Sequence, residues 1–256
     1  YDSSWSTLQL VDRPAATAAC LGFMGELLKR NNPKRAAALL TEAVRLIEKT
    51  DKGWIKVLLY QVLGEINFLL GNYAEATAQI TQGRALAKQM AWARGLASGH
   101  KSLGRISLSL GHYRQAEAYL REGISVARQH HLNILCLEST IGLGEALRLQ
   151  GHVDDAHACF VESRQLVEAL DGGLLMAPVL WEEGCLAEQC GEYKVAKARF
   201  ADSLAIGLPP WWSHALPTPG WALLGLGEVE EAQIYFQKAL TAAQAEERTP
   251  ISLDAQ

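Results

Sequence analysis

A pattern of small and large residues recurs about every 40 positions along this 256-residue chain. Each copy begins with a small residue, has a glycine seven positions later, often a tyrosine two positions after that glycine, and an alanine five positions after it. A large apolar residue follows the alanine by four positions, and another small residue comes three positions later. Self-similarity at such a period is the signature of stacked supersecondary units, so it constrains the fold more than any other feature of the sequence.

Five copies of the pattern are clear and one more is weak. The clear copies begin at Gly64, Gly104, Gly144, Gly184 and Gly220. Their alanines are Ala76, Ala116, Ala156, Ala196 and Ala232, and their large residues are Ile80, Leu120, Phe160, Phe200 and Phe236. The weak first copy has Gly25, then Asn31-Asn32 in place of the second glycine, and Ala36 or Ala37. The array is therefore predicted to span residues 15–245, with repeat anchors near positions 25, 64, 104, 144, 184 and 220.

Each copy predicts a pair of antiparallel helices. Apolar residues at i, i+4 and i+7 follow the helical period, and no useful run alternates as a strand would. A glycine, or the Asn31-Asn32 pair, can supply the positive φ that ends the first helix. The alanine is expected where the second helix crosses the first, because a small side chain lets two helix axes approach closely. A lone hairpin cannot bury its apolar face, so neighbouring hairpins must stack.

These residues resemble the tetratricopeptide repeat (TPR) signature position by position over nearly the whole chain. The resemblance implies an all-α fold, an α-solenoid of about six antiparallel helix hairpins in a right-handed superhelix. The usual repeat has about 34 residues and a proline after its second helix, whereas this period is 39–40 residues and lacks that proline. The second helices or their exits are therefore expected to be longer. In its period and style the array also resembles the C-terminal sensor arrays of MalT-like and AfsR-like bacterial signalling ATPases.

Charge is distributed unevenly along the chain, whose formal net charge is −4. Residues 1–128 contain 17 Lys/Arg and 10 Asp/Glu, which gives a formal charge of +7. Residues 129–256 contain 7 Lys/Arg and 18 Asp/Glu, which gives a formal charge of −11. The total gives no reason to expect nucleic acid or an anionic membrane as a partner. The two halves of the array are instead expected to carry opposite charge.

The cysteines and the absence of targeting signals bear on the compartment. The chain has five cysteines and no CxxC motif, which predicts reduced thiols in a cytoplasmic protein. No basic-then-apolar leader opens the chain, and no stretch reaches the roughly 18 apolar residues of a membrane span.

The two ends and one internal segment depart from the repeat pattern. Residues 1–14 are expected to be a lead-in or the remnant of a preceding element, because the chain begins at Tyr1 and not at Met. Residues 208–219 contain four prolines, so an irregular linker is predicted there. Thr218 is the expected N-cap, and Pro219 the first position, of a late and shortened helix. Residues 246–256 are expected to form a mobile tail.

Motifs for catalysis and metal binding are not found in the sequence. It contains no Walker A, HExxH or GxSxG motif, and no GxGxxG after a strand. The candidate metal ligands are His130 with His131, His152 with His157, and Cys185 with Cys190, and none of these pairs has the i, i+4 spacing of a helical zinc site. Adjacent carboxylates occur at Glu182-Glu183 and Asp154-Asp155, but the second pair is expected in the first turn of a helix, where the dipole favours acids. We therefore expect no cofactor, no metal and no catalytic residue.

The TPR resemblance also implies where a partner binds. In this family the first helix of each hairpin lines the concave face, at positions three before, one after and four after the first small anchor. The candidate partner-binding residues are Gln61, Glu65, Phe68, Lys101, Arg105, Leu108, Ile141, Glu145, Arg148, Trp181, Cys185, Glu188 and Trp221. This mixture of charged and apolar groups suits a protein or peptide segment. Of the seven tryptophans, Trp181 and Trp221 are expected on this face and the others mostly between hairpins.

The sequence thus favours a non-catalytic module that binds proteins or peptides. Such a module is expected to be the sensor or scaffold part of a larger bacterial cytoplasmic signalling or transcriptional regulator, with a peptide segment or other domains of the same longer chain as its partner. The alternative is a free-standing TPR adaptor or co-chaperone of a secretion or assembly complex. Chaperone-binding members of the family hold a C-terminal carboxylate in a clamp of Lys, Asn and Arg, which only Lys101 matches. An enzyme built on helical repeats is a third possibility, and no catalytic constellation supports it.

Overall fold

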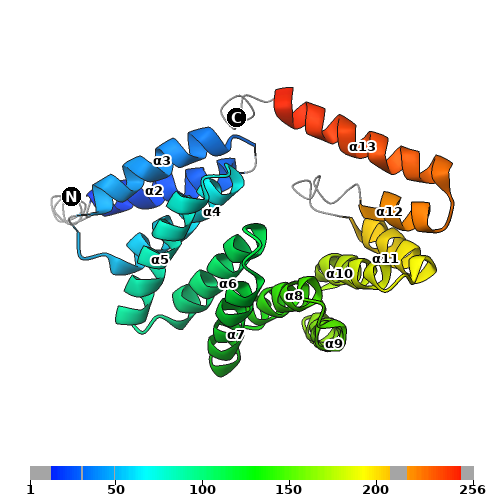
Figure 1. Ribbon diagram of the computed structural model, residues 1–256. Coiled ribbons are helices and arrows are strands. Elements are labelled where there is room, and N and C mark those ends of the chain that lie inside the picture. The colour runs from blue at the N-terminus through cyan, green and yellow to red at the C-terminus, as the bar shows by residue number, and fades with distance from the viewer. Residues whose placement is uncertain (1–12, 30, 49, 208–217, 249–256) are drawn as a thin grey trace. The chain divides into compact units, whose positions relative to one another are not determined.

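The computed structural model describes residues 13–29, 31–48, 50–207 and 218–248. Throughout these residues the regular elements are helices, with no strand among them (Figure 1). The chain forms two compact units, the first ending at Ile106 and the second beginning at Ser107. The boundary falls inside one helix, α6 (Ala93–Ser109), which contributes residues to both units.

The described residues form twelve α-helices in six consecutive pairs. In chain order the pairs are α2 (Arg13–Leu28) with α3 (Pro33–Ile47), α4 (Gly53–Leu69) with α5 (Tyr73–Gln89), α6 (Ala93–Ser109) with α7 (Tyr113–Gln129), α8 (Asn133–Leu149) with α9 (Val153–Ala169), α10 (Met176–Gln189) with α11 (Tyr193–Ile206), and α12 (Thr218–Gly225) with α13 (Val229–Arg248). A 3-10 turn, η1 (Gly173–Leu175), leads into α10. The predicted all-α solenoid of about six helix hairpins is confirmed, and the handedness of the array stays a prediction.

The 40-residue period consists of two equal halves. The six helices from α4 to α9 contain 17 residues each, and three residues separate each helix from the next. A new helix therefore begins every 20 residues. The long period was expected to come from longer second helices or exits, but in this part of the chain the first and second helices are equally long.

Each of these helices ends in the same left-handed break, two residues after its last helical residue. The first helices break at Gly71, Gly111 and Gly151, with φ of 78°, 73° and 84°, and the second helices at Ala91, His131 and Asp171, with φ of 50°, 53° and 48°. The next N–H donates to the carbonyl five residues earlier, as in a Schellman motif; for Trp92 and Ala87 the distance is 2.9 Å. The glycine breaks were predicted. The breaks at Ala, His and Asp were not, because these residue types gave no comparable signal.

The first hairpin turns differently from the later ones. Asn32 has a φ of −152°, so it is not the residue of the Asn31-Asn32 pair that could supply the expected positive φ. The side chain of Asn32 instead accepts a hydrogen bond from the N–H of Arg35 at 3.0 Å. Pro33 follows as the first helical residue, where a missing N–H costs nothing. Asn32 therefore begins the second helix of this hairpin.

Replacing Ala91 by glycine is expected to stabilise unit 1. A residue with a Cβ pays roughly 1 kcal/mol in the left-handed conformation, and glycine does not. Part of the gain is lost because glycine has more freedom in the unfolded chain, so the free energy of unfolding should rise by about 0.5 kcal/mol. The reverse change at the matched break, Gly71→Ala, should lower it by about 1 kcal/mol. Urea unfolding followed by circular dichroism measures both, and a destabilised Ala91→Gly variant would contradict the left-handed break at Ala91.

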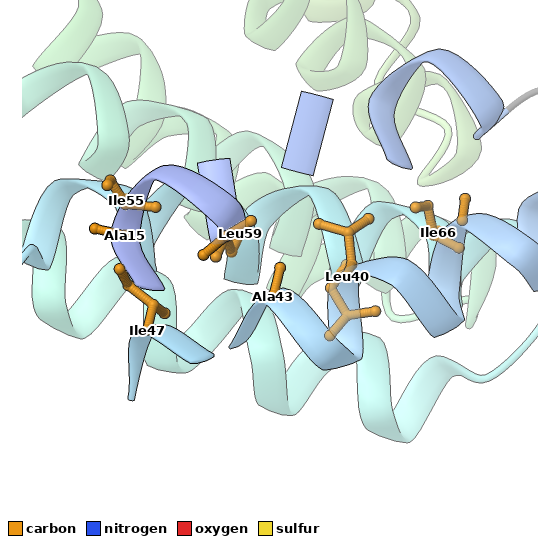
Figure 2. Packing of buried hydrophobic residues seen from close by; sticks show 10 residues of the cluster. Ala15, Leu40, Ala43, Ile47, Ile55, Leu59 and Ile66 are labelled. Atoms are coloured by element: carbon orange, nitrogen blue, oxygen red, sulfur yellow. The ribbon is translucent and has the colours of Figure 1, made fainter. Parts of the chain in front are cut away.

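The core of unit 1 lies where α2, α3 and α4 meet. Figure 2 shows apolar side chains of α3 and α4 packed together with Ala15 of α2. On α3 the buried stripe consists of Ala36, Leu40, Ala43 and Ile47, and on α4 it consists of Ile55, Leu59, Leu63 and Ile66. The spacing on both helices is that of one helical face, so α4 packs on the hairpin before it through a continuous apolar seam.

Small residues lie at the helix crossings, as predicted. The alanines Ala76, Ala116, Ala156, Ala196 and Ala232 have no exposed surface. The first glycine of the pattern has a related role, because a Cβ on Gly184 would lie 2.6 Å from the ring of Phe200. A Cβ on Gly64 would likewise lie 2.6 Å from Ile80. The large residue of the second helix thus packs directly on the small residue of the first.

The sixth hairpin begins late, as expected. Helix α12 has eight residues, and α11 is followed by Gly207 with a φ of 107°. Thr218 is the first residue of α12 and not the cap before it, and Pro219 is buried in its first turn, a shift of one position. Helix α13 continues to Arg248, three residues past the predicted end of the array. Residues 1–12, most of the predicted linker (208–217) and residues 249–256 lie outside the described residues.

Candidate functional site

The thirteen predicted partner-binding residues lie on the first helices of five hairpins, α4, α6, α8, α10 and α12. Within a helix these positions are three or four residues apart, so they share one face. We call it the partner face of that helix. The partner face of α4 and that of α6 up to Ile106 belong to unit 1, and those of α8, α10 and α12 belong to unit 2.

In unit 1, Glu65 lies among three cationic side chains. The Nζ of Lys29 is 2.9 Å from its carboxylate, and Lys101 and Arg105 of α6 act on it electrostatically. Burial raises the pKa of Glu65, but these three cations outweigh burial and hold the pKa below its ordinary value. Glu26 also pairs with Lys29, at 2.7 Å. Three positive charges against two negative ones leave this corner of the partner face cationic.

Arg105 is the exposed one of the three cations. Its guanidinium lies over the ring of Phe68, 5.4 Å from the centroid, and Phe68 in turn meets Tyr73 edge to face at 5.8 Å. Contact with the ring restrains the guanidinium, and the residue itself stays exposed to solvent. A guanidinium held in this way is suited to bind a carboxylate through two parallel hydrogen bonds.

Gln61 has a structural role on the same face. It is buried, and its Nε2 donates to the backbone carbonyl of Gly95 at 2.6 Å. This bond joins α4 to the start of α6 and uses the amide that was expected to meet a partner. Lys101, on the neighbouring helix, is half-buried.

Two apolar residues on the partner face of α4 were not predicted. Trp54 is 51% exposed, and Leu58 is also exposed. They precede Glu65 by eleven and seven residues, which places them on the same side of the helix. Trp54 was expected to pack between hairpins, and that expectation is wrong. The spacing that selected Gln61 and Glu65 would have found both residues if it had been extended two turns towards the start of α4.

In unit 2, a nearly buried contact between an arginine and a glutamate joins α8 to α10. The Nη2 of Arg148 lies 3.3 Å from the carboxylate of Glu182, and both side chains are nearly buried. Within the described part of the chain, the Nε of Arg148 has no hydrogen-bond partner. Burial and, to a smaller extent, the charge of Glu145 raise the pKa of Glu182 to about 8 although Arg148 lowers it. Much of Glu182 is therefore protonated at neutral pH.

The neighbouring Glu183 forms salt bridges with other residues. Its carboxylate is 2.5 Å from Arg164 of α9 and 3.1 Å from Arg199 of α11. Adjacent helical residues point about 100° apart, so Glu182 and Glu183 reach different helices. Two carboxylates held apart in this way do not form the shared site that paired acid and base catalysis needs.

The predicted residues of α10 are largely buried. Trp181 is 3% exposed, and its ring is 4.9 Å from that of Phe200. Together with Cys185 it belongs to a core cluster that includes Ala222 of α12, so the next hairpin covers it. The expectation that Trp181 is an exposed groove residue is wrong for this reason. Burial also raises the pKa of the Cys185 thiol, which makes it a weak nucleophile.

The other predicted residues of unit 2 are covered to different degrees. Leu108 is buried, Ile141 packs against a core cluster, and Glu145 and Glu188 are half-buried. Trp221 of α12 is 57% exposed and meets Phe236 edge to face at 5.1 Å. Leu224, one turn later, is also exposed and was not predicted. In unit 2 the exposed apolar groups of the partner face thus include this pair on α12.

Other kinds of site find little support in the described residues. A shallow hollow of about 470 Å³ opens at hairpin turns of unit 2, lined in part by His112, Arg114 and His152, away from the partner face. Among the residues that the structure covers, His, Cys, Asp and Glu do not gather in groups of three or more that could hold a metal ion. No helix in those same ranges is both long and apolar enough to cross a membrane.

Comparison with known sequences identifies the repeat in part of the chain. Residues 102–130 and 220–246 match the family model described as tetratricopeptide repeat. No curated protein sequence matches the chain significantly.

Comparison with solved structures covers nearly the whole chain. NprR in complex with its cognate peptide NprX has a TM-score of 0.75 and 16% identity, over 96% of this chain and 74% of that one. Aspartyl phosphate phosphatase F from Bacillus subtilis has a TM-score of 0.77 and 12% sequence identity, over 98% of this chain and 65% of that one. A Rap protein complexed with competence and sporulation factor has a TM-score of 0.77 and 14% sequence identity, over 96% of this chain and 68% of that one. The chain therefore spans about two thirds to three quarters of the length of these proteins, and at such identities the likeness shows the shared fold.

Proposed function

We propose that this chain is a non-catalytic regulatory array that binds an extended peptide or protein segment on the partner faces of its first helices. The observation that carries the proposal is the partner face of α4, where Trp54 and Leu58 are exposed at one end and Arg105 stacks on Phe68 at the other. Tryptophan and arginine are the residue types that most often dominate binding interfaces. Two structures with the same fold, NprR and the Rap protein, are complexes with NprX and with competence and sporulation factor, which supports a peptide as the ligand.

The geometry of α4 suggests the chemistry of the segment that unit 1 binds. Trp54 and Phe68 are 14 residues apart, a rise of roughly 21 Å along the helix. An extended chain covers that length in about six or seven residues. The cationic corner around Lys101 and Arg105 favours an acidic side chain or a terminal carboxylate at one end of the segment. Trp54 and Leu58 favour an aromatic or large aliphatic side chain at the other end.

The wider role that we propose is the sensor or scaffold part of a larger bacterial regulator of signalling or transcription in the cytoplasm, of which the MalT-like and AfsR-like proteins are one form. Other domains of that longer chain are then possible partners of the array as well. A free-standing adaptor or co-chaperone remains the alternative, and it is less favoured because Lys101 is the only residue that matches the chaperone clamp.

A peptide-selection experiment tests the binding proposal. The chain is presented with a library of random heptapeptides, and the best binder is labelled for fluorescence anisotropy. We expect selected peptides to combine an acidic group with an aromatic or aliphatic residue. Trp54→Ala and the double change Lys101→Ala/Arg105→Ala should each weaken binding by at least about tenfold, which corresponds to 1.4 kcal/mol.

Matched controls for these variants lie on second helices. Arg45→Ala removes an exposed arginine of α3, and Val161→Ala removes an exposed apolar side chain of α9. Both should bind the selected peptide as the wild type does. If folded Trp54→Ala and Lys101→Ala/Arg105→Ala variants also kept full affinity, the partner face of unit 1 would not be the site.

A further inference from the structure

Glu65 lies in the middle of the cationic corner of unit 1 and can be reached from solvent. Its side chain is 27% exposed, and the Nζ of Lys29 lies 2.9 Å from its carboxylate. Lys101 and Arg105 of α6 act on the same carboxylate from the next hairpin. Burial raises the pKa of Glu65, but the three cations together hold it below its ordinary value, so the carboxylate is charged at neutral pH. A ligand that binds Arg105 therefore meets a negative charge on the same face.

Lys29 is neutralised by carboxylates of the chain itself. Its Nζ lies 2.7 Å from the carboxylate of Glu26 as well as 2.9 Å from that of Glu65, and its side chain is only 15% exposed. Burial lowers the pKa of Lys29, but the two carboxylates outweigh burial and the pKa is raised. Arg105, in contrast, is exposed. Of these two cations, Arg105 is therefore the one that a ligand can reach.

The charges of the cationic corner leave a surplus of one. Lys29, Lys101 and Arg105 supply three positive charges, and Glu26 and Glu65 supply two negative ones. One carboxylate of a ligand brings the sum to zero, whereas a second carboxylate beside it makes the sum negative, and like charges repel. Without the charge of Glu65 the surplus would be two. Glu65 therefore limits how much negative charge the corner can accept.

The position of Arg105 brings its ligand close to Glu65. The guanidinium lies over the ring of Phe68, 5.4 Å from the centroid. Phe68 follows Glu65 by three residues, so the two side chains share one face of α4. Charges on a partly buried face are screened less than charges in open solvent. The repulsion from Glu65 is thus felt by each carboxylate that a ligand places at Arg105.

We propose that Glu65 is a specificity-determining residue of unit 1, which makes the partner face select a segment with one acidic group over a segment with two adjacent acidic groups. The inference rests on the peptide binding proposed above and adds the ligand charge that this binding accepts. Lys101 and Arg105 attract the first acidic group, and Glu65 repels the second. If Glu65 only held Lys29 in place, its removal would change the affinity for every ligand by the same factor.

Three forms of the selected heptapeptide test the proposal. The first has a single acidic group, the second has the amide in its place, and the third has an aspartate added beside the acidic group. Fluorescence anisotropy gives the Kd of each form for the wild type and for Glu65→Gln. The wild type should bind the singly acidic form best. In Glu65→Gln, the affinity for the doubly acidic form relative to the singly acidic form should rise at least about tenfold.

Matched variants separate the charge of Glu65 from its structural contacts. Glutamine can still accept a hydrogen bond from Lys29, which also keeps Glu26, so Glu65→Gln should fold, as circular dichroism checks. Glu65→Asp keeps the carboxylate and should keep the wild-type ratio of affinities, whereas Glu65→Ala should raise the ratio as Glu65→Gln does. Glu42→Gln removes a charge that pairs with Arg45 on the exposed side of α3, and it should leave the ratio unchanged.

The possible outcomes distinguish this inference from the binding proposal. Equal changes in affinity for all three peptides in Glu65→Gln would give Glu65 a structural role only and overturn the inference. A wild type that prefers the doubly acidic form would overturn it as well. In both cases peptide binding on the partner face would stand if Trp54→Ala still weakens it. If the wild type binds no heptapeptide at all, both proposals fail together.

Discussion

Phe200→Ala is expected to lower the free energy of unfolding by about 3–5 kcal/mol, the largest effect of any single change considered for this chain. The phenyl ring is almost wholly buried, packs against Trp181 at 4.9 Å and lies directly on Gly184. Its removal leaves a cavity between α10 and α11 that the surrounding helices cannot fully close. Urea unfolding, followed by circular dichroism, measures the loss.

A double-mutant cycle tests the contact that gives this repeat its spacing. Gly184→Ala alone should cost about 1–3 kcal/mol, because the new Cβ meets the Phe200 ring at 2.6 Å. In the Phe200→Ala background the same Cβ enters the cavity, so the two losses should fall short of additivity by about 1 kcal/mol or more. The equivalent pair Gly144 and Phe160 should behave alike. Strictly additive losses at both pairs would show that the small and large residues do not touch.

Raising the pH from 5 to 9 is expected to destabilise the wild type relative to Glu182→Gln. Burial raises the pKa of Glu182 to about 8, from 4.5 for an ordinary glutamate. The folded chain therefore keeps a proton that the unfolded chain releases. The stabilisation is fully present below pH 4.5 and is lost as the pH rises through about 8. The pKa difference corresponds to a loss on the order of 3–5 kcal/mol.

Glu182→Gln should escape most of this loss. The glutamine has no charge to bury, and its carbonyl oxygen can still accept a hydrogen bond from Arg148. The stability difference between variant and wild type should grow between pH 5 and 8 and then level off. Glu188→Gln is the matched control on the same helix. Burial raises the pKa of Glu188 and Arg148 lowers it, but its carboxylate is only half-buried, so the pH effect should be much smaller. Parallel pH profiles for wild type and Glu182→Gln would contradict the buried, protonated state.

The parts of the fold that sequence could predict are those that short stretches of chain decide. The positive φ at Gly71, Gly111 and Gly151 and the burial of Ala156 and Ala196 follow from local requirements of a turn and of a helix crossing. Both requirements recur at fixed spacing, so the hairpins and their number could be read directly. Glycine and alanine are informative here because larger residues are excluded from those places.

The candidate site was harder to predict because exposure depends on the neighbouring hairpin. Trp181 and Gln61 occupy the same position in their repeats as Lys101, yet both are buried. Trp181 is covered by α12, and Gln61 is turned inward to donate a hydrogen bond to the carbonyl of Gly95. Trp54 lies on the same face of α4 as Gln61, two turns earlier, and is half-exposed. Repeat position fixes which side of a helix a residue takes, and the packing of the next pair decides whether solvent or a partner can reach it.

The regular succession of 17-residue helices and three-residue breaks has a consequence for how this chain folds. The described helices contact mainly the one or two helices next to them in the chain, so the loops that must close are short and their entropic cost is small. Folding of such a chain can begin at any hairpin and spread to both sides, and its stability is close to a sum of hairpin and neighbour contributions. With only eight residues in α12, the last pair contributes least to that sum. We therefore expect the pair α12 and α13 to open before the central hairpins do.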